Sequence, residues 1–219
     1  MATRRRQGDV AGEFQPGGND VAKRADAGNP AVKRAALGFR AHSGWAALVA
    51  LGGSAEAPLV VRRGRIELCH RGGEREGQPY HAAAEMRLPE AREYLDECAR
   101  TAQGMALNAI GQAVADLRAK GYRVTGAGLV TASGRPLPEL AKVLAAHPLI
   151  HTAEGEFFRE AIRQGCEACG LEVTGLRERD LRSVEGEYER ASDLGKLAGP
   201  PWRADEKLCT MAAWRVLEK

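Results

Sequence analysis

Hydrophobic and polar positions begin to alternate at Leu37, and three short apolar segments follow. Glycine-containing turns separate these segments, which is typical of strands joined in an antiparallel meander. The predicted strands cover residues 37–42, 45–51 and 59–68. The third contains Gly64 within a run of arginines, where we expect a bulge or a break. Residues 71–88 are polar and predict a loop with weak structure.

In the second part of the chain the hydrophobic period becomes three or four. Apolar residues spaced in this way from Leu95 to Leu117 predict a long helix over 89–120, which Gly121 ends. Further strands are predicted over 122–131 and 171–176, and further helices over 138–169 and 203–217. The polar segment 177–196 is expected to be partly helical. Strands that are joined through helices are expected to be parallel, with right-handed crossovers.

The first 36 residues differ from the rest of the chain. They show no sustained hydrophobic period, so we expect a disordered leader over 1–36 and a single domain over 37–219. The whole chain has 32 basic and 29 acidic residues, a net charge of +3. All of this excess lies in the leader, whose arginines either keep the chain soluble or contact phosphate. Basic and acidic residues are equal in number in the domain, so its net charge does not indicate general binding of nucleic acid.

The composition indicates where in the cell the protein is located and whether its cysteines are oxidised. No apolar segment is as long as the roughly 20 residues that span a bilayer. A secretory signal has an apolar stretch after its basic residues, and no such stretch follows the first arginines here. We therefore expect a cytoplasmic protein with no membrane partner and with reduced cysteines. Cys166 and Cys169 form one Cys-x-x-C without the second pair of a structural zinc site. They are expected to be two small apolar side chains one helical turn apart.

The predicted order of elements resembles the ribonuclease H-like fold. Leu37–Arg40 and Gly44–Val49 resemble the first two strands of its Holliday-junction resolvase branch. Gly199, the segment Ala204–Lys207 and Met211 resemble the region of its terminal helix. The resemblance implies an α/β fold, a three-layer domain with a mixed five-stranded sheet.

The resemblance also shows a departure at the active site. The family's catalysts hold two divalent ions with carboxylates, the first of which lies in the first strand. This chain has Arg40 there, which cannot ligate Mg²⁺ and would repel it. Residues 131–133 offer no acid either, and only Asp205 and Glu206 remain in place. We therefore expect a pseudo-enzyme without a cofactor, a binding or assembly module associated with nucleic acid.

The second predicted helix carries polar residues within its apolar stripe. His147, His151 and Glu154 follow the spacing i, i+4, i+7 and lie on one face. They form a satisfied core network, bind one divalent metal ion such as zinc or non-haem iron, or provide an acid–base pair in His151 and Glu154. The alternative function is thus a metal-dependent hydrolase or nuclease, with His151, Glu154 and Asp205 as catalytic residues. Pro148 would break this geometry if it divided the helix.

The remaining candidates have weaker patterns. Three other histidines lie near predicted loops without a connecting spacing and are expected to face solvent. They are His42, His70 and His81. The arginines around Gly64 either protect a sheet edge or contact phosphate. The sequence identifies no partner, and nucleic acid is a candidate through the leader and through Arg62, Arg63 and Arg65.

Overall fold

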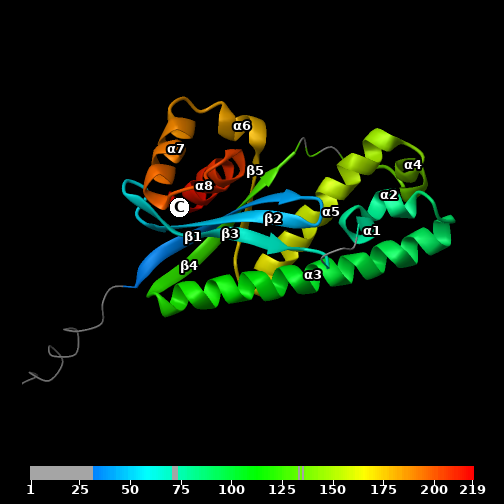
Figure 1. Cartoon of the computed structure of the whole chain (residues 1–219), viewed down its shortest axis with the longest axis horizontal. Coiled ribbons are helices and arrows are strands. Elements are labelled where there is room, and N and C mark those ends of the chain that lie inside the picture. The colour runs from blue at the N-terminus through cyan, green and yellow to red at the C-terminus, as the bar shows by residue number, and fades with distance from the viewer. Residues whose placement is uncertain (1–31, 71–73, 133, 135) are drawn as a thin grey trace, which may run out of the picture. The chain divides into compact units, whose positions relative to one another are not determined.

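A computed structural model describes residues 32–70, 74–132, 134 and 136–219. Within these residues one mixed sheet has the strand order β3-β2-β1-β4-β5 (Figure 1). The first three strands are antiparallel, whereas β1, β4 and β5 run parallel to one another. The strands are β1 (Lys33–His42), β2 (Trp45–Gly53), β3 (Pro58–Glu67), β4 (Tyr122–Thr131) and β5 (Val173–Arg177). The predicted mixed five-stranded sheet is confirmed.

Helices cover both faces of the sheet, as Figure 1 shows. The long helix α3 and the helix α5 pack together on one face, and α8 packs on the other, next to α7. The described helices are α1 (Glu74–Gly77), α2 (Pro79–Ala83), α3 (Leu88–Ala119), α4 (Leu140–Leu144), α5 (His147–Ala168), α6 (Glu178–Arg182), α7 (Glu187–Ala198) and α8 (Ala204–Leu217). This arrangement confirms the predicted three-layer domain. None of the described helices is long and apolar enough to cross a membrane.

Alternation along β1 sends its side chains to different layers. Leu37 and Phe39 are fully buried in the core formed with α3 and α5. Gly38 faces α8, and a Cβ atom on it would lie 1.8 Å from the carbonyl oxygen of Cys209. A Cβ atom on Gly128 of β4 would lie 2.2 Å from another carbonyl oxygen of α8. The two glycines thus let the backbone of α8 lie directly on the sheet, which fixes where its first turn lies.

The structure corrects the predicted start of the domain. β1 begins at Lys33, which pairs with Tyr122 of β4, and Ala36 is fully buried. The predicted leader over 1–36 is therefore too long at its end. Residues 1–31 lie outside the described residues. The sequence pattern did not predict the first four residues of β1, because two cations followed by two alanines show no alternation of apolar and polar residues.

Three local expectations also differ from the structure. The irregular pairing of β2 with β3 lies between Ala50 and Leu51 of β2, whereas Gly64 pairs in regular register. The segment over 71–88 contains α1 and α2 in its described part. The helix predicted over 138–169 is two helices, α4 and α5.

Pro148 is the second residue of α5 and does not break the helix. It lies in the first turn, where a missing backbone N–H leaves no helical hydrogen bond unmade. His147 and His151 therefore remain one turn apart in a single helix.

The cysteines behave as small apolar side chains. All five are free, and Cys166 is fully buried in the core between α3 and α5. Burial raises the pKa of the Cys166 thiol to about 12, so it stays protonated at neutral pH. The interpretation of the Cys-x-x-C as part of the packing agrees with this environment.

Candidate functional site

The carboxyl ends of the parallel strands β1, β4 and β5 meet at one edge of the sheet, where open α/β sheets form ligand sites. Arg40 lies near the end of β1, Glu178 directly follows β5, and Asp205 lies in the first turn of α8. The Arg40 guanidinium donates hydrogen bonds to Asp205 Oδ1 and, over 3.0 Å, to Glu178 Oε2. One cation therefore joins the first strand to two acids from elements far along the chain.

The charges at this site support one another. Burial lowers the pKa of Arg40, but the hydrogen bond to Asp205 and the charges of Glu178 and Asp205 raise it overall. Burial raises the pKa of Asp205, but the hydrogen bond from Arg40 and the neighbouring His42 lower it overall. The pKa of Glu178 is also lowered, because Arg182 and Arg40 outweigh the effect of burial. Both carboxylates are therefore ionised at neutral pH.

His42 extends this site toward the turn between β1 and β2. Its Nε2 atom lies 3.1 Å from Asp205 Oδ2, and its ring stacks on Trp45 with centroids 4.3 Å apart. The guanidinium carbon of Arg65 lies 4.2 Å from the Trp45 ring centroid. His42 is half-buried and in contact with an acid, so the expectation that it simply faces solvent is wrong.

Acid should weaken the fold through Asp205. Because its pKa is lower in the folded chain, its contribution is complete above the unfolded value of about 3.9 and is lost as the pH falls through the folded value. We expect urea unfolding to show a free energy that declines below about pH 4. The Asp205→Asn variant should show a shallower decline. Equal declines in the two proteins would mean that the contact with Arg40 does not stabilise the folded chain.

A second polar cluster lies between α2 and α5, in the layer opposite α8. The ring centroids of His147 and His151 are 4.4 Å apart. The ring centroid of His81 lies 4.8 Å from that of His151 and 5.3 Å from that of His147. One possible ligand nitrogen from each histidine lies within 4.8 Å of the others. Glu154 is buried, with its Oε1 atom 2.8 Å from His81 Nδ1 and 3.2 Å from the His81 backbone nitrogen.

The structure places His147 and His151 side by side and Glu154 against His81, and the exposure of both histidines contradicts their predicted place in the apolar stripe. His147 and His151 are exposed, whereas Glu154 is 4% exposed and is bound by His81. The expectation that His81 faces solvent without a partner is wrong, because His81 contacts Glu154. No sequence pattern indicated this contact, since no spacing connects α2 with α5. Asp205 is not part of this cluster, because it lies in the layer of α8, bound to Arg40.

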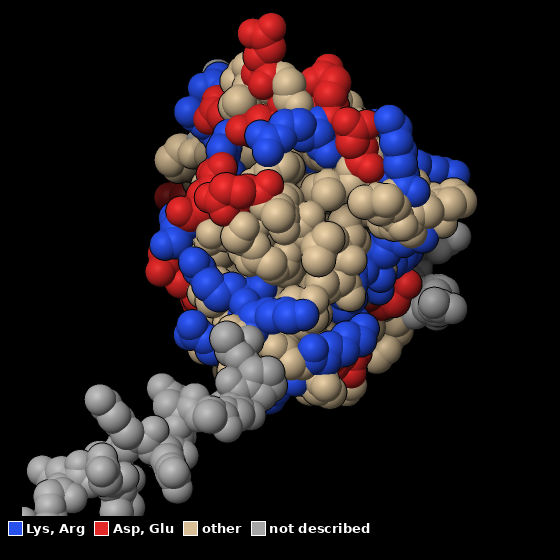
Figure 2. All heavy atoms as spheres, turned by 90° about the vertical axis from the view of Figure 1, so that its left-hand side faces the viewer, with Lys and Arg blue, Asp and Glu red and all other residues tan. Residues whose placement is uncertain are grey.

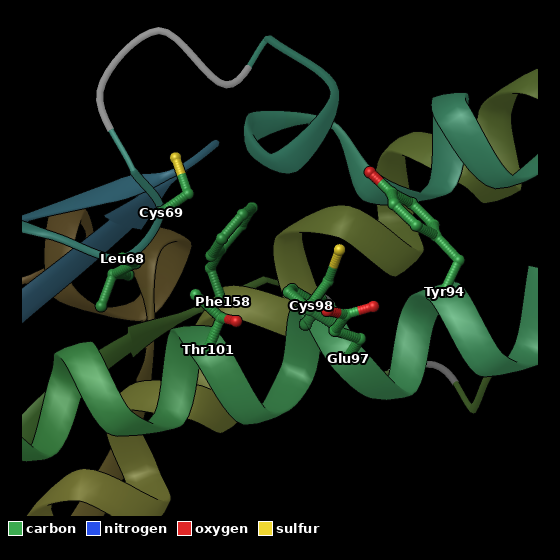
Figure 3. Close-up of a pocket in the computed structure, with 8 residues that line it drawn as sticks. Leu68, Cys69, Tyr94, Glu97, Cys98, Thr101 and Phe158 are labelled. Carbon is green, nitrogen blue, oxygen red and sulfur yellow. The ribbon is translucent and has the colours of Figure 1, made fainter.

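A pocket of about 160 Å³ lies between the end of β3, α3 and α5 (Figure 3). Figure 3 shows Glu97, Cys98 and Thr101 along α3, and Phe158 projecting from α5 toward the strand end that carries Leu68. The full lining is Leu68, Cys69, Tyr94, Glu97, Cys98, Thr101, Phe157 and Phe158. None of these residues belongs to the arginine site or to the histidine cluster, so the pocket is separate from both.

The arginines predicted to contact phosphate have partners within the molecule. Arg62 pairs with Asp116 of α3. Arg63 donates hydrogen bonds to the carbonyl oxygens of residues 199–201. Arg65 pairs with Glu67. The contacts of Arg62 and Arg63 join β3 to α3 and to the segment before α8, whereas that of Arg65 lies within β3. Phosphate binding by the three arginines stays a prediction.

No protein-family model matches the sequence, and no curated protein matches it. Solved structures match the fold. Thermus thermophilus RuvC in complex with a Holliday junction substrate has a TM-score of 0.50 and 8% identity, over 83% of this chain and 90% of that chain. A second Thermus thermophilus RuvC structure has a TM-score of 0.47 and 7% identity, over 82% and 91%. The fold is ribonuclease H-like.

The sequence resemblance predicted Arg40 in the first strand in place of a catalytic carboxylate, and the structure places Arg40 near the end of β1. Glu178 was not among the residues that the sequence pointed to, although an acid directly after a strand was a local signal for it. Glu178 and Asp205 have the oxygen atoms that Mg²⁺ prefers. Both carboxylates instead bind the guanidinium of Arg40.

Proposed function

We propose that this ribonuclease H-like domain binds nucleic acid, or assembles on it, without two-metal hydrolysis. The observation that carries the proposal is the guanidinium of Arg40 between Glu178 and Asp205. It supplies the positive charge that divalent ions supply in a two-metal centre, and it repels such ions. The guanidinium also offers no electron pair to a metal, so position 40 supplies no carboxylate ligand from the first strand.

A cluster of exposed cations at the other end of the strands supports binding to phosphates. This basic face consists of Lys33, Arg34, Arg118, Lys120 and Arg123. Within the described part of the chain, no acidic side chain forms an ion pair with Lys33, Arg34, Arg118 or Arg123. Figure 2 views this end of the fold, with Lys and Arg side chains gathered on its lower half. Unpaired cations of this kind attract a phosphate backbone without reading its sequence.

The arginine site presents a different electrostatic surface. Arg177 pairs with Asp180, and Arg182 pairs with Glu178, so cations and acids alternate there. A phosphate backbone therefore finds unpaired positive charge at the basic face rather than at the edge where a catalyst would act. The RuvC neighbour was solved with a Holliday junction substrate, which makes branched DNA the first probe to use.

We expect the chain to bind a four-way DNA junction in a salt-dependent manner and to leave it uncut in Mg²⁺ or Mn²⁺. The double variant Arg118→Ala/Arg123→Ala should bind more weakly, with a log K against log salt slope reduced by about 2, because two phosphate contacts are lost. Fluorescence anisotropy over a series of salt concentrations measures this slope. The matched control is Arg177→Ala/Arg179→Ala, which removes the same charge at the other end of the strands. Metal-dependent cleavage by the wild type, or equal slopes in both variants, would contradict the proposal.

The second candidate function is metal-dependent hydrolysis at the histidine cluster. The observation that favours it is the exposure of His147 and His151, which leaves an ion bound there open to water and substrate. Zinc lowers the pKa of such a water to about 7 and makes it a nucleophile. Glu154 lies beside His81, where it can orient that histidine. Turnover of a simple phosphodiester by the zinc-loaded chain, lost in His151→Ala, would favour this function over the first.

A further inference from the structure

We infer that His81, His147 and His151 form a zinc-binding site in which Glu154 orients a ligand and is not a ligand itself. The site differs from the ligand set that the helical spacing predicted, because His81 takes the place of the carboxylate. It requires neither nucleic-acid binding nor hydrolysis, and it lies in a different layer from Arg40.

The three imidazoles come from two elements and converge on one point. His147 and His151 lie one turn apart on α5, the spacing by which helices present two histidines to zinc. His81 approaches from α2, and the three candidate nitrogens lie within 4.8 Å of one another. Tetrahedral zinc with bonds of about 2.0–2.1 Å places its nitrogen ligands about 3.4 Å apart. Rotation of the exposed side chains His147 and His151 closes the difference.

Glu154 fixes the state of His81 that a metal ion needs. His81 Nδ1 lies 2.8 Å from Glu154 Oε1, and in the tautomer with the proton on Nδ1 that atom donates a hydrogen bond to the carboxyl group. The lone pair of Nε2 is then available to a metal ion. Zinc-binding histidines have this arrangement, in which the second ring nitrogen donates to a carboxylate.

The burial of Glu154 is a second, independent indication of a cation. A buried carboxylate is costly unless a positive charge or several donors compensate for it. Within the described residues no lysine or arginine pairs with Glu154, and its contacts are the backbone and ring of His81. A divalent ion on His81 would place a positive charge next to this buried carboxyl group, on the far side of the imidazole ring.

The ligand chemistry selects the ion. Imidazole nitrogens suit zinc, whereas Mg²⁺ and Ca²⁺ require oxygen ligands. Three protein ligands would leave one coordination position for water, beside the exposed side chains of His147 and His151. Because His81 belongs to α2 whereas His147 and His151 belong to α5, the ion would hold the short helix α2 against α5.

The test uses the full chain without a polyhistidine tag, stripped with a chelator and titrated with zinc chloride by calorimetry. We expect one zinc ion per chain. His81→Ala, His147→Ala and His151→Ala should each weaken binding at least about 100-fold, and Glu154→Gln about 10- to 100-fold. His42→Ala and His70→Ala are matched controls, since they remove the other two histidines of the chain, and should bind like the wild type.

Two further measurements separate loss of a ligand from loss of folding. Hydrogen exchange should slow in α2 when zinc binds the wild type, and should not change in His151→Ala. Circular dichroism of the metal-free variants should match the metal-free wild type, because His147 and His151 are exposed. A chain that binds no stoichiometric zinc, or that binds it equally well without His151, would overturn the inference.

Discussion

The Gly38→Ala variant should lose about 3 kcal/mol of unfolding free energy, although it adds a single methyl group. That methyl would lie 1.8 Å from the carbonyl oxygen of Cys209 and 2.7 Å from its carbonyl carbon. Both are backbone atoms in the middle of α8, so no side-chain rotation relieves the overlap. The helix must move away from β1 and take Asp205, in its first turn, away from Arg40.

A matched substitution isolates this packing effect. Gly104 is exposed in the middle of α3, and nothing lies within 4 Å of a Cβ atom placed there. Gly104→Ala should therefore stabilise the chain by up to about 1 kcal/mol, through helix propensity alone. Urea unfolding of the two variants beside the wild type measures both effects. A Gly38→Ala protein within about 0.5 kcal/mol of the wild type would mean that α8 does not lie directly on β1.

Arg40→Asp should turn the arginine site into one that binds Mn²⁺. The substitution replaces the cation by a third carboxylate beside Glu178 and Asp205. Without metal, repulsion between like charges should lower the melting temperature below that of the wild type. With Mn²⁺ about 100-fold above its Kd, the melting temperature should rise by about 5–10 °C, because the ion binds only the folded chain.

The control for this variant is Arg40→Met, which removes the guanidinium without adding a ligand. It should be destabilised by the two carboxylates left without their partner, and Mn²⁺ should not restore it. Differential scanning calorimetry of both variants and the wild type, each with and without Mn²⁺, gives the comparison. A wild type that responds to Mn²⁺ as strongly as Arg40→Asp would show that Arg40 does not exclude the metal.

Local periodicity was sufficient for most of the fold. The long helix and β4 were predicted within one residue of their observed bounds, because an apolar period marks the helix and Gly121 separates the two elements. The start of β1 was missed, since Lys33 and its neighbours acquire their strand structure from pairing with β4. A contact of this kind depends on residues about 90 positions away, which no local pattern contains.

In the candidate sites, too, residues placed by local spacing were predicted and residues placed by tertiary contacts were not. The spacing of His147 and His151 follows from one helix, so the sequence alone placed them together. His81 and Glu178 join their clusters through tertiary contacts, with His81 separated from Glu154 by 73 positions and Glu178 from Arg40 by 138. Asp205 was found through the fold resemblance, which supplied the three-dimensional proximity that spacing lacks.

The ion pairs of Arg40 give this edge of the sheet a counterion that is part of the polypeptide. In a two-metal centre, the carboxylates repel one another whenever the ions leave, so the charge of the site follows the free metal concentration. Here the cation is covalently attached to β1 and cannot diffuse away. Under the proposed function, the edge should therefore keep one charge state in the presence or absence of magnesium, and chelators should leave its local structure unchanged.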